Sequence, residues 1–219
     1  LALSAATAAH AQSVPFQNPS FESPVLADGA FQQGGTDWSF LGADAGTFNP
    51  SAASYAGGAP DGDNVAFIAD GGILQVLPVN LAVNQTYRLR FAVGNRADNP
   101  VGANVPLTVS VYGTNVRSSG TMPAGTPVAF QATVFAPAAG TFRYEEFAFT
   151  TNAGTPGIGL PLVVALEGTA FPAQFNVDDF SLTAGQPIQQ AVPVNGPGAL
   201  WILGGLALAA GLLALRRNA

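Results

Sequence analysis

Between residues 14 and 184 the apolar positions follow the two-residue period of β-strands, and no stretch has a helical period. In the clearest segment, residues 86–93, apolar side chains alternate with Arg88 and Arg90. Successive side chains of a strand point to opposite faces, so this pattern predicts a strand with one buried face. The further predicted strands are 20–22, 65–68, 73–77, 107–112, 128–135, 142–150, 160–166 and 175–182. About nine short strands separated by Gly, Pro, Asn and Asp predict an all-β fold, a jelly-roll β-sandwich.

Two breaks in the pattern predict local features. Asp70-Gly71-Gly72 separates the apolar runs 65–68 and 73–77, which predicts a hairpin. In the last strand the apolar side chains are at odd positions before Asp178-Asp179 and at even positions after it. One extra residue restores the phase, so we expect a β-bulge there.

The two ends of the chain predict processing segments around a domain at 12–184. Residues 1–11 are small and apolar and end in Ala9-His10-Ala11, which is typical of a signal peptide remnant cleaved after Ala11. The alternative is a short Ala-rich helix. At the other end, the uncharged run 198–215 is followed by a basic tail, residues 216–219. This predicts a single transmembrane helix with its C-terminus in the cytoplasm; a buried core helix is the alternative.

A Pro-containing linker, residues 185–197, precedes the uncharged run. Its motif residues and the basic pair after the run are Val192, Pro193, Pro197, Arg216 and Arg217. This layout resembles the bacterial PEP-CTERM and IPTL-CTERM sorting signals, although Val194 stands where the first pattern has Glu. The resemblance implies an exported protein held in the inner membrane until an exosortase-type enzyme processes it, and later placed at the cell surface or outside the cell.

Composition excludes several kinds of chemistry. The chain of 219 residues has no cysteine, and its single histidine, His10, falls in the segment expected to be removed. The mature domain therefore has no disulfide, thiolate or imidazole base. Lysine is absent and the formal net charge is −6, so a nucleic-acid-binding protein is excluded by the lack of a basic surface.

A second resemblance covers residues 16–184. Its motifs are Asn18-Pro19-Ser20-Phe21-Glu22, Trp38, Tyr87-Arg88-Leu89-Arg90-Phe91 and the segment 175–182. Together they resemble the galactose-binding-like jelly roll of carbohydrate-binding modules. The resemblance implies a structural calcium ion, with Glu22 and Asp178 or Asp179 as carboxylate ligands. The alternative is that these carboxylates accept hydrogen bonds from backbone N–H groups in turns. For Asp61-Gly62-Asp63-Asn64 a plain turn is favoured over a calcium loop.

Sugar binding requires exposed aromatic rings and polar groups that bind hydroxyls. The candidate ligand-binding residues are Trp38, Tyr55, Asn95, Arg96 and Tyr112. Trp38 also fits a position in the core, and the loop from Asn95 also fits a solvated turn. Tyr55, in a loop rich in Gly and Ala, is expected to be exposed.

The function expected from these features is non-enzymatic. We expect an exported surface protein that binds carbohydrate or exopolysaccharide, with an exosortase-type enzyme and the membrane as further partners. The first alternative is a structural or adhesive matrix protein without a sugar site. The second is a carboxylate-dependent glycan-active enzyme that uses acids such as Glu145-Glu146 or Asp178-Asp179.

Overall fold

The computed structural model describes residues 11–115 and 126–185, and every regular element in these residues is a β-strand. The predicted all-β class is confirmed for this part of the chain. The strands are β1 (Gln12–Val14), β2 (Phe31–Gln33), β3 (Ser39–Phe48), β4 (Val65–Asn80), β5 (Thr86–Asn95), β6 (Pro106–Gly113), β7 (Phe130–Phe135), β8 (Thr141–Thr150), β9 (Pro161–Thr169) and β10 (Phe175–Gly185).

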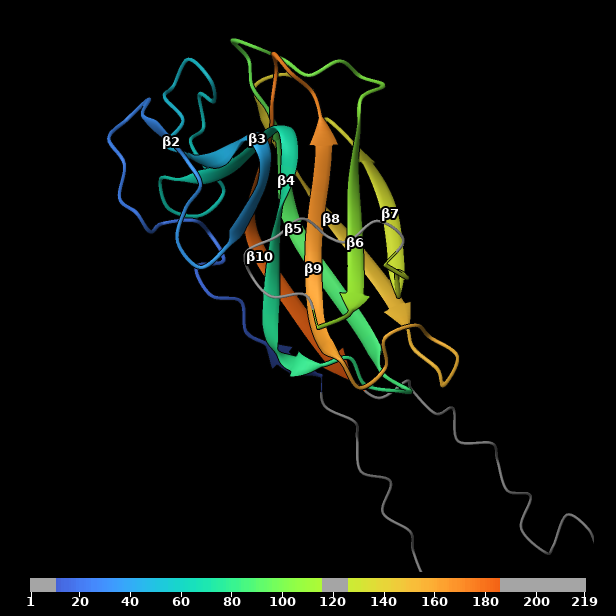
Figure 1. Ribbon diagram of the computed structural model, residues 1–219. Coiled ribbons are helices and arrows are strands. Elements are labelled where there is room, and N and C mark those ends of the chain that lie inside the picture. The colour runs from blue at the N-terminus through green and yellow to red at the C-terminus, as the bar shows by residue number, and fades with distance from the viewer. Residues whose placement is uncertain (1–10, 116–125, 186–219) are drawn as a thin grey trace, which may run out of the picture. The chain divides into compact units, whose positions relative to one another are not determined.

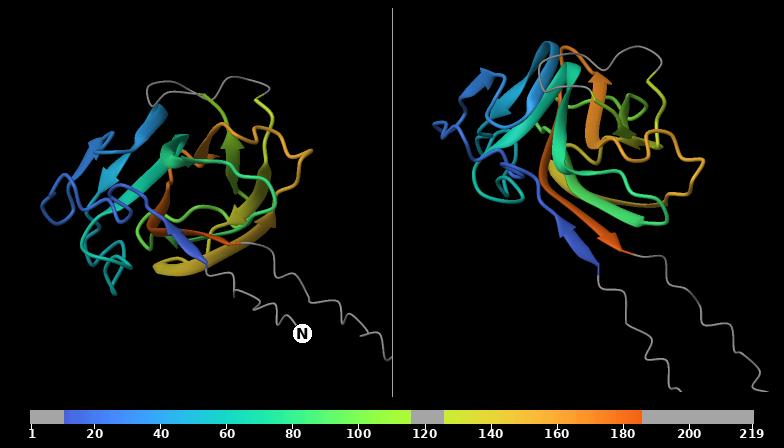
Figure 2. Two further views of the ribbon diagram at one scale, coloured as in Figure 1. Left: turned by 90° about the horizontal axis from the view of Figure 1, so that it is seen from below. Right: turned by 60° about the horizontal axis from the view of Figure 1, so that its bottom comes forward.

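The strands form two layers joined through β4, as expected for a jelly roll. The hydrogen-bonded order is β7-β6-β9-β4-β10-β5-β8, and all of these pairs are antiparallel. In Figure 1, β6 and β9 run in front of β10, β5 and β8. Figure 2 shows from below how the sheet rolls around the space between the layers. We call β8, β5 and β10 the rear layer and β6, β9 and the second half of β4 the front layer.

The predicted hairpin at Asp70-Gly71-Gly72 is wrong, because β4 continues through it. Residues 66–68 of β4 pair with β10, and residues 70–76 pair with β9. The strand therefore passes from the rear layer to the front layer at this point. Gly71 has φ +129°, and a Cβ there would lie 1.9 Å from the carbonyl oxygen of Leu41. The glycine serves a bend and a close backbone approach rather than a reversal.

The core lies between the layers and is formed by the alternating residues predicted to face inward. Leu89, Phe91 and Val93 of β5 are fully buried in one cluster with apolar side chains of β6, β9 and β10. At one end of this cluster four aromatic rings pack together: Phe16, Phe21, Trp38 and Phe180. Burial of this apolar area supplies the main stabilisation of the fold.

The N-terminal part of the chain differs from the prediction. Residues 20–22 form no strand, and Phe21 has φ +59°. The strands β1, β2 and β3 were not predicted. The sequence of β3 contains two glycines and an aspartate, which hide its apolar alternation.

The predicted segments at the two ends fall largely outside the described residues. The signal peptide remnant, the motif residues Val192, Pro193 and Pro197, the transmembrane helix 198–215 and the tail with Arg216 and Arg217 stay predictions. Among the described residues no helix is long and apolar enough to cross a membrane.

Candidate active site

The β-bulge predicted at Asp178-Asp179 is confirmed, and it builds the most developed polar cluster of the rear layer. Asp178 pairs with Ala92 and Ser181 with Arg90, so two residues of β10, Asp179 and Phe180, stand opposite one residue of β5. Asp179 takes φ +49°. Phe180 enters the core, whereas Asp179 turns to the outer face of the layer beside Arg90.

The Asp179 carboxylate is held by two side chains from the neighbouring strands. Arg90 Nη1 donates to Asp179 Oδ2 at 3.2 Å, and Tyr144 Oη donates to the same oxygen at 2.8 Å. The guanidinium carbon of Arg90 lies 3.6 Å from the centre of the Tyr144 ring. Partial burial and the hydrogen bond to Asp179 raise the pKa of the Tyr144 hydroxyl. We call Arg90, Tyr144 and Asp179 the triad.

This triad has a geometry that stability alone does not require. The Arg90 and Asp179 side chains are 40% and 31% exposed, and an ion pair with such exposure contributes only about 0–1 kcal/mol. The carboxylate is nevertheless fixed from two sides and still reaches solvent. An oriented, accessible carboxylate is the kind of group that transfers protons in enzymes.

Asp178 lies next to the triad but is fully buried. Burial raises the pKa of its carboxyl group to about 8, although the backbone N–H groups of Asp61 and Asp179 donate to it at 3.0 and 2.7 Å. Desolvation penalises the charged form more than these two hydrogen bonds favour it. Burial therefore favours the protonated form of Asp178 in the folded protein, and its side chain holds the loop at Asp61 against β10.

A pocket of about 380 Å³ opens between that loop and the start of β8. It is lined by Tyr55, Gly57, Gly58, Ala59, Pro60, Gly140, Thr141, Phe142 and Tyr144. The Tyr55 and Phe142 rings lie 4.2 Å apart between centres. Tyr144 belongs both to the pocket and to the triad, so the Asp179 carboxylate, which does not itself line the pocket, adjoins it through Tyr144. Aromatic walls with few oriented polar groups are typical of sites for small organic molecules.

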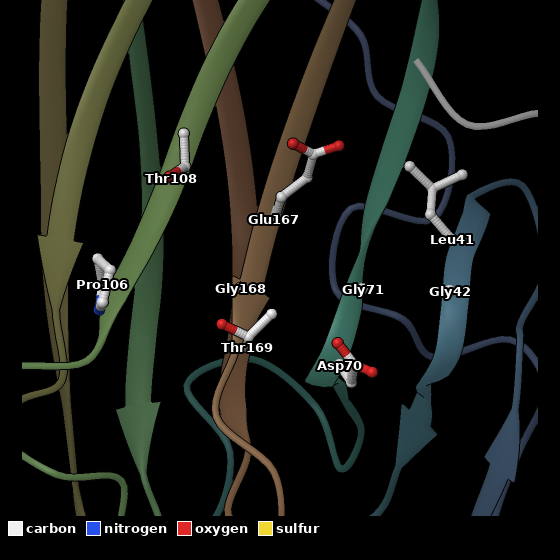
Figure 3. A pocket seen from close by; sticks show the side chains of 9 residues that line it. All are labelled: Leu41, Gly42, Asp70, Gly71, Pro106, Thr108, Glu167, Gly168 and Thr169. Atoms are coloured by element: carbon white, nitrogen blue, oxygen red, sulfur yellow. The ribbon is translucent and has the colours of Figure 1, made fainter. Parts of the chain in front are cut away.

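A second hollow of about 380 Å³ lies on the outer face of the front layer, where β4 bends (Figure 3). Asp70 of β4 and Glu167 of β9 contribute carboxylates to it, and Leu41 and Pro106 contribute apolar surface. Within the described part of the chain, no hydrogen bond or ion pair involves the Asp70 or Glu167 side chain. The two hollows thus differ in that only the rear-layer site has an oriented carboxylate.

Two of the predicted sugar-binding aromatic residues are buried for structural reasons. Trp38 is 5% exposed, stacks on Phe16, and donates from Nε1 to the carbonyl oxygen of Asn18 at 3.0 Å. Tyr112 is 6% exposed and packs in an apolar cluster with Leu74 on the front layer. Neither ring presents a free face for a sugar.

The prediction that Tyr55 is exposed is wrong, since only 1% of this residue is accessible. Its loop folds onto the rear layer, where Gly94 leaves space: a Cβ there would lie 2.6 Å from Tyr55 Oη and 2.3 Å from Phe142. Tyr55 is nevertheless one of the residues that line the pocket. It is the only predicted ligand-binding residue that the described pockets include.

Asn95 and Arg96 hold loops in place. The amide oxygen of Asn95 accepts from Val101 N at 2.7 Å, and its Nδ2 donates to the carbonyl oxygen of Pro137 at 2.9 Å. Arg96 donates to both carboxylate oxygens of Asp98, and this pairing lowers the pKa of Asp98. Asn95 is 4% exposed at the end of β5, so it is neither a sugar-binding residue on the surface nor part of a solvated turn.

Of the three predicted calcium ligands, Asp179 accepts hydrogen bonds from Arg90 and Tyr144. Glu22 Oε1 accepts from the backbone N–H groups of Asp63 and Asn64 at 3.0 and 2.8 Å, and Asp178 accepts from Asp61. The structure therefore shows the turn-capping alternative for Glu22 and Asp178. In residues 11–115 and 126–185 no group of three or more His, Cys, Asp or Glu is placed to hold a metal ion.

Arg90 and Tyr144 were not predicted as site residues. The sequence showed Arg90 on the outward face of the clearest strand, but a solvated charge is the ordinary interpretation of such a position. The bulge was the usable signal, because it predicts that the side chain of β10 turns outward toward β5. The pairing of Ala92 with both Tyr144 and Asp178 could not be predicted from the sequence, because it depends on the order of the strands in the sheet.

Fold and site together define a jelly-roll β-sandwich with an oriented carboxylate beside an aromatic pocket. Residues 12–183 match the family described as HpiC1-like, HpiC1 cyclase, so the chain belongs to this family. A search of curated proteins found no match.

Solved structures with a similar fold include Fisc, a Stig cyclase from Fischerella sp. TAU in complex with (3Z)-3-(1-methyl-2-pyrrolidinylidene)-3H-indole. It is 20% identical with a TM-score of 0.66, over 81% of this chain and 100% of that one. A cyclase from the same organism, in complex with 4-(1H-indol-3-yl)butan-2-one, is 19% identical with a TM-score of 0.64, over 80% and 99% of the two chains. At these identities the likeness shows the fold.

The family match overturns the expected function. The family is one of cyclases, which are enzymes, whereas the sequence patterns favoured a non-enzymatic carbohydrate-binding surface protein. Two of the expected partners, carbohydrate or exopolysaccharide and an exosortase-type enzyme, are wrong for the same reason. The membrane, as the third expected partner, depends on residues 198–215 and stays a prediction. The inference failed because the lack of His and Cys placed a carboxylate-dependent enzyme last among the alternatives, although a carboxylate alone can transfer protons.

Proposed function

We propose that this protein is a cyclase that closes a ring in a small unsaturated molecule at the aromatic pocket of the rear layer. The observation that carries the proposal is the Asp179 carboxylate, oriented by Arg90 and Tyr144 beside the pocket. Family membership supports the reaction class. The front-layer hollow has carboxylates too, but neither is oriented by a partner among the described residues.

Because Arg90 and Tyr144 both donate to Asp179 Oδ2, we assign Asp179 as the base of a cycle that begins with proton removal. Asp179 accepts the proton of a substrate N–H group, and the electron pair released into the ring system makes a ring carbon nucleophilic. This carbon forms the new C–C bond with an electrophilic unsaturated carbon. The displaced electron pair moves to the neighbouring atom, which takes the proton back from Asp179. Substrate and product have the same composition, and the carboxylate is regenerated.

The other members of the triad have distinct tasks in this cycle. Arg90 stabilises the carboxylate before and after each proton transfer, and Tyr144 fixes the oxygen that carries the proton. The rings of Phe142 and Tyr144 exclude water and provide faces for an aromatic substrate, and the buried Tyr55 ring supports Phe142. A heteroaromatic substrate with an N–H group agrees with the indole-bearing ligands in the two Fischerella structures.

Tyr144→Phe tests the orientation of the carboxylate. The variant keeps the ring under Arg90 and removes the hydroxyl that donates to Asp179. Because a hydrogen bond to a charged group is worth about 1.5–3 kcal/mol, we expect kcat for an indole-bearing unsaturated substrate to fall roughly ten- to a hundredfold. Tyr112→Phe, on the front layer, is the matched control and keeps the wild-type kcat. If Tyr144→Phe also keeps the wild-type kcat, the Tyr144 hydroxyl takes no part in the mechanism.

Calcium is proposed only at the turn next to Glu22. Asn64 is 1% exposed, and its Oδ1 atom is buried without a hydrogen-bond partner. The backbone N–H of Asn64 donates to Glu22 Oε1 at 2.8 Å. Ca²⁺ takes carboxylate and amide oxygens, so Glu22 and Asn64 fit as two of its ligands, and the ion would stabilise the turn.

We expect calcium to raise the melting midpoint and EGTA to reverse the increase. Glu22→Gln should abolish the difference between the two conditions, because it removes the charged ligand. Glu146→Gln, which changes an exposed acid on β8, is the control and keeps the difference. A wild-type midpoint that is the same in calcium and in EGTA would show that Glu22 only caps the turn.

A further inference from the structure

The segment of residues 56–60, which forms one wall of the rear-layer pocket, is attached to β10 at both ends. On its N-terminal side Tyr55 Oη donates to Asn176 Oδ1 at 2.9 Å, across 121 positions of sequence. On its C-terminal side Asp61 N donates to Asp178 Oδ2 at 3.0 Å. Asn176 and Asp178 are two residues apart on one strand, so both point to the same face. We call residues 56–60 the pocket wall.

Between these two attachments the pocket wall has few contacts of its own. Gly58 N donates to the carbonyl oxygen of Tyr55 at 3.1 Å. A Cβ added at Gly57 or Gly58 would meet nothing within 4 Å, so neither residue packs closely against the rest of the protein. Ala59 packs against the buried cluster of Phe48, Val65 and Phe67. The position of the wall therefore depends on this packing and on its two anchors.

The Tyr55 anchor is built as a buried polar contact. Tyr55 and Asn176 are 1% and 0% exposed, and Asn176 Nδ2 donates to the carbonyl oxygen of Ala66 at 3.3 Å. Burial raises the pKa of the Tyr55 hydroxyl, which stays protonated and remains a donor. If the hydroxyl is removed, Asn176 Oδ1 is left in the interior without this donor, which is unfavourable.

We infer that Tyr55 is a positioning residue that, through Asn176, fixes the pocket wall at the distance from Phe142 and Tyr144 that the substrate requires. This inference rests on the proposed function, since the pocket is taken as the substrate site. The anchor lies on the strand that also carries Asp179, so wall and carboxylate keep a constant separation. Loss of the anchor should weaken substrate binding more than it slows the chemical step.

The test compares Tyr55→Phe with Tyr87→Phe in the full chain. Tyr87 is the matched control: it is 2% exposed, stacks on Phe149 as Tyr55 packs on Phe142, and its hydroxyl accepts from Ala82 N at 2.9 Å. Both variants lose one buried hydrogen bond and keep the ring. We expect comparable decreases of the melting midpoint, which shows that stability alone does not distinguish them.

Two readouts separate positioning from a general loss of stability. In Tyr55→Phe, hydrogen exchange of a peptide covering residues 56–61 should become about tenfold faster, whereas Tyr87→Phe should leave it unchanged. Binding of the probe 4-(1H-indol-3-yl)butan-2-one, followed by isothermal titration calorimetry, should weaken about tenfold in Tyr55→Phe only. Asn176→Ser should reproduce both effects, and the double variant should add nothing to them.

The inference and the proposed function fail in different ways. If Tyr55→Phe and Tyr87→Phe show the same exchange at residues 56–61, Tyr55 does not position the wall. The same conclusion follows if Tyr55→Phe binds the probe as tightly as wild type. If the wild-type protein does not bind the probe, the proposed substrate class is wrong. The exchange experiment then still decides whether Tyr55 anchors the wall.

Discussion

As the pH rises from 4 to 8, wild type should lose several kcal/mol of unfolding free energy that the Asp178→Asn variant does not lose. Burial raises the pKa of Asp178 from the ordinary 3.8 to about 8 in the folded protein. Between these values the unfolded chain releases the proton and the folded chain keeps it, so wild-type stability falls as the pH rises. The stabilisation that comes from the raised pKa of Asp178 is fully present below pH 4 and is lost as the pH rises through about 8. Each unit of pKa corresponds to about 1.4 kcal/mol.

Asparagine has no proton to lose, so the variant lacks this slope. Its amide can accept from only one of the two backbone N–H groups that donate to Asp178, and this lost hydrogen bond costs the variant about 1–3 kcal/mol of unfolding free energy, a cost that does not depend on pH. The variant is therefore less stable than wild type at pH 4. By pH 8 the difference in unfolding free energy between the two proteins becomes small or changes sign. Urea unfolding at intervals between these values measures the difference, with Asp63→Asn, an exposed acid, as control. Parallel curves for wild type and Asp178→Asn would show that Asp178 is ionised in the folded protein.

Asp179→Asn should lower kcat by a factor of about 10² to 10⁴, the usual contribution of a positioned acid–base group. The variant has nearly the same shape, and its amide oxygen can still accept from Arg90 Nη1 and Tyr144 Oη. It has no basic oxygen, so it cannot take a proton from the substrate. Because the ion pair is partly exposed, the melting midpoint should change by only a few degrees.

Asp179→Glu distinguishes the charge from its position. The longer side chain keeps the carboxylate but moves it away from the oxygen position that Tyr144 fixes at 2.8 Å. Activity between those of wild type and Asp179→Asn is expected. Single-turnover measurements at saturating substrate separate the chemical step from binding. Equal turnover by wild type and Asp179→Asn would show that the carboxylate takes no part in proton transfer.

Much of the fold could be predicted, because it depends on local alternation. The β5 pattern, with Leu89, Phe91 and Val93 on one face, is visible in the sequence and is buried as expected. The bulge at Asp178-Asp179 could be predicted from the same alternation. The course of β4 could not, since Asp70-Gly71-Gly72 fits both a hairpin and a bend, and only the pairing with β9 and β10 decides between them.

The site depends on contacts between distant parts of the sequence, and there the sequence was less informative. Tyr55 looked exposed because its loop is rich in Gly and Ala, yet Gly94 and Asn176 provide it with a buried position. Asp178 and Asp179 look equivalent as neighbours in sequence. The bulge gives them different surroundings, one buried carboxyl with a raised pKa and one carboxylate bound to Arg90.

The most direct test compares turnover of one indole-bearing unsaturated substrate by wild type, Asp179→Asn, and the front-layer double variant Asp70→Asn/Glu167→Gln. Liquid chromatography with mass detection identifies a cyclised product by an unchanged mass and a changed retention time. We predict such a product with wild type and with the double variant, and almost none with Asp179→Asn. Product from Asp179→Asn but not from the double variant would contradict the account and place the chemistry in the front-layer hollow.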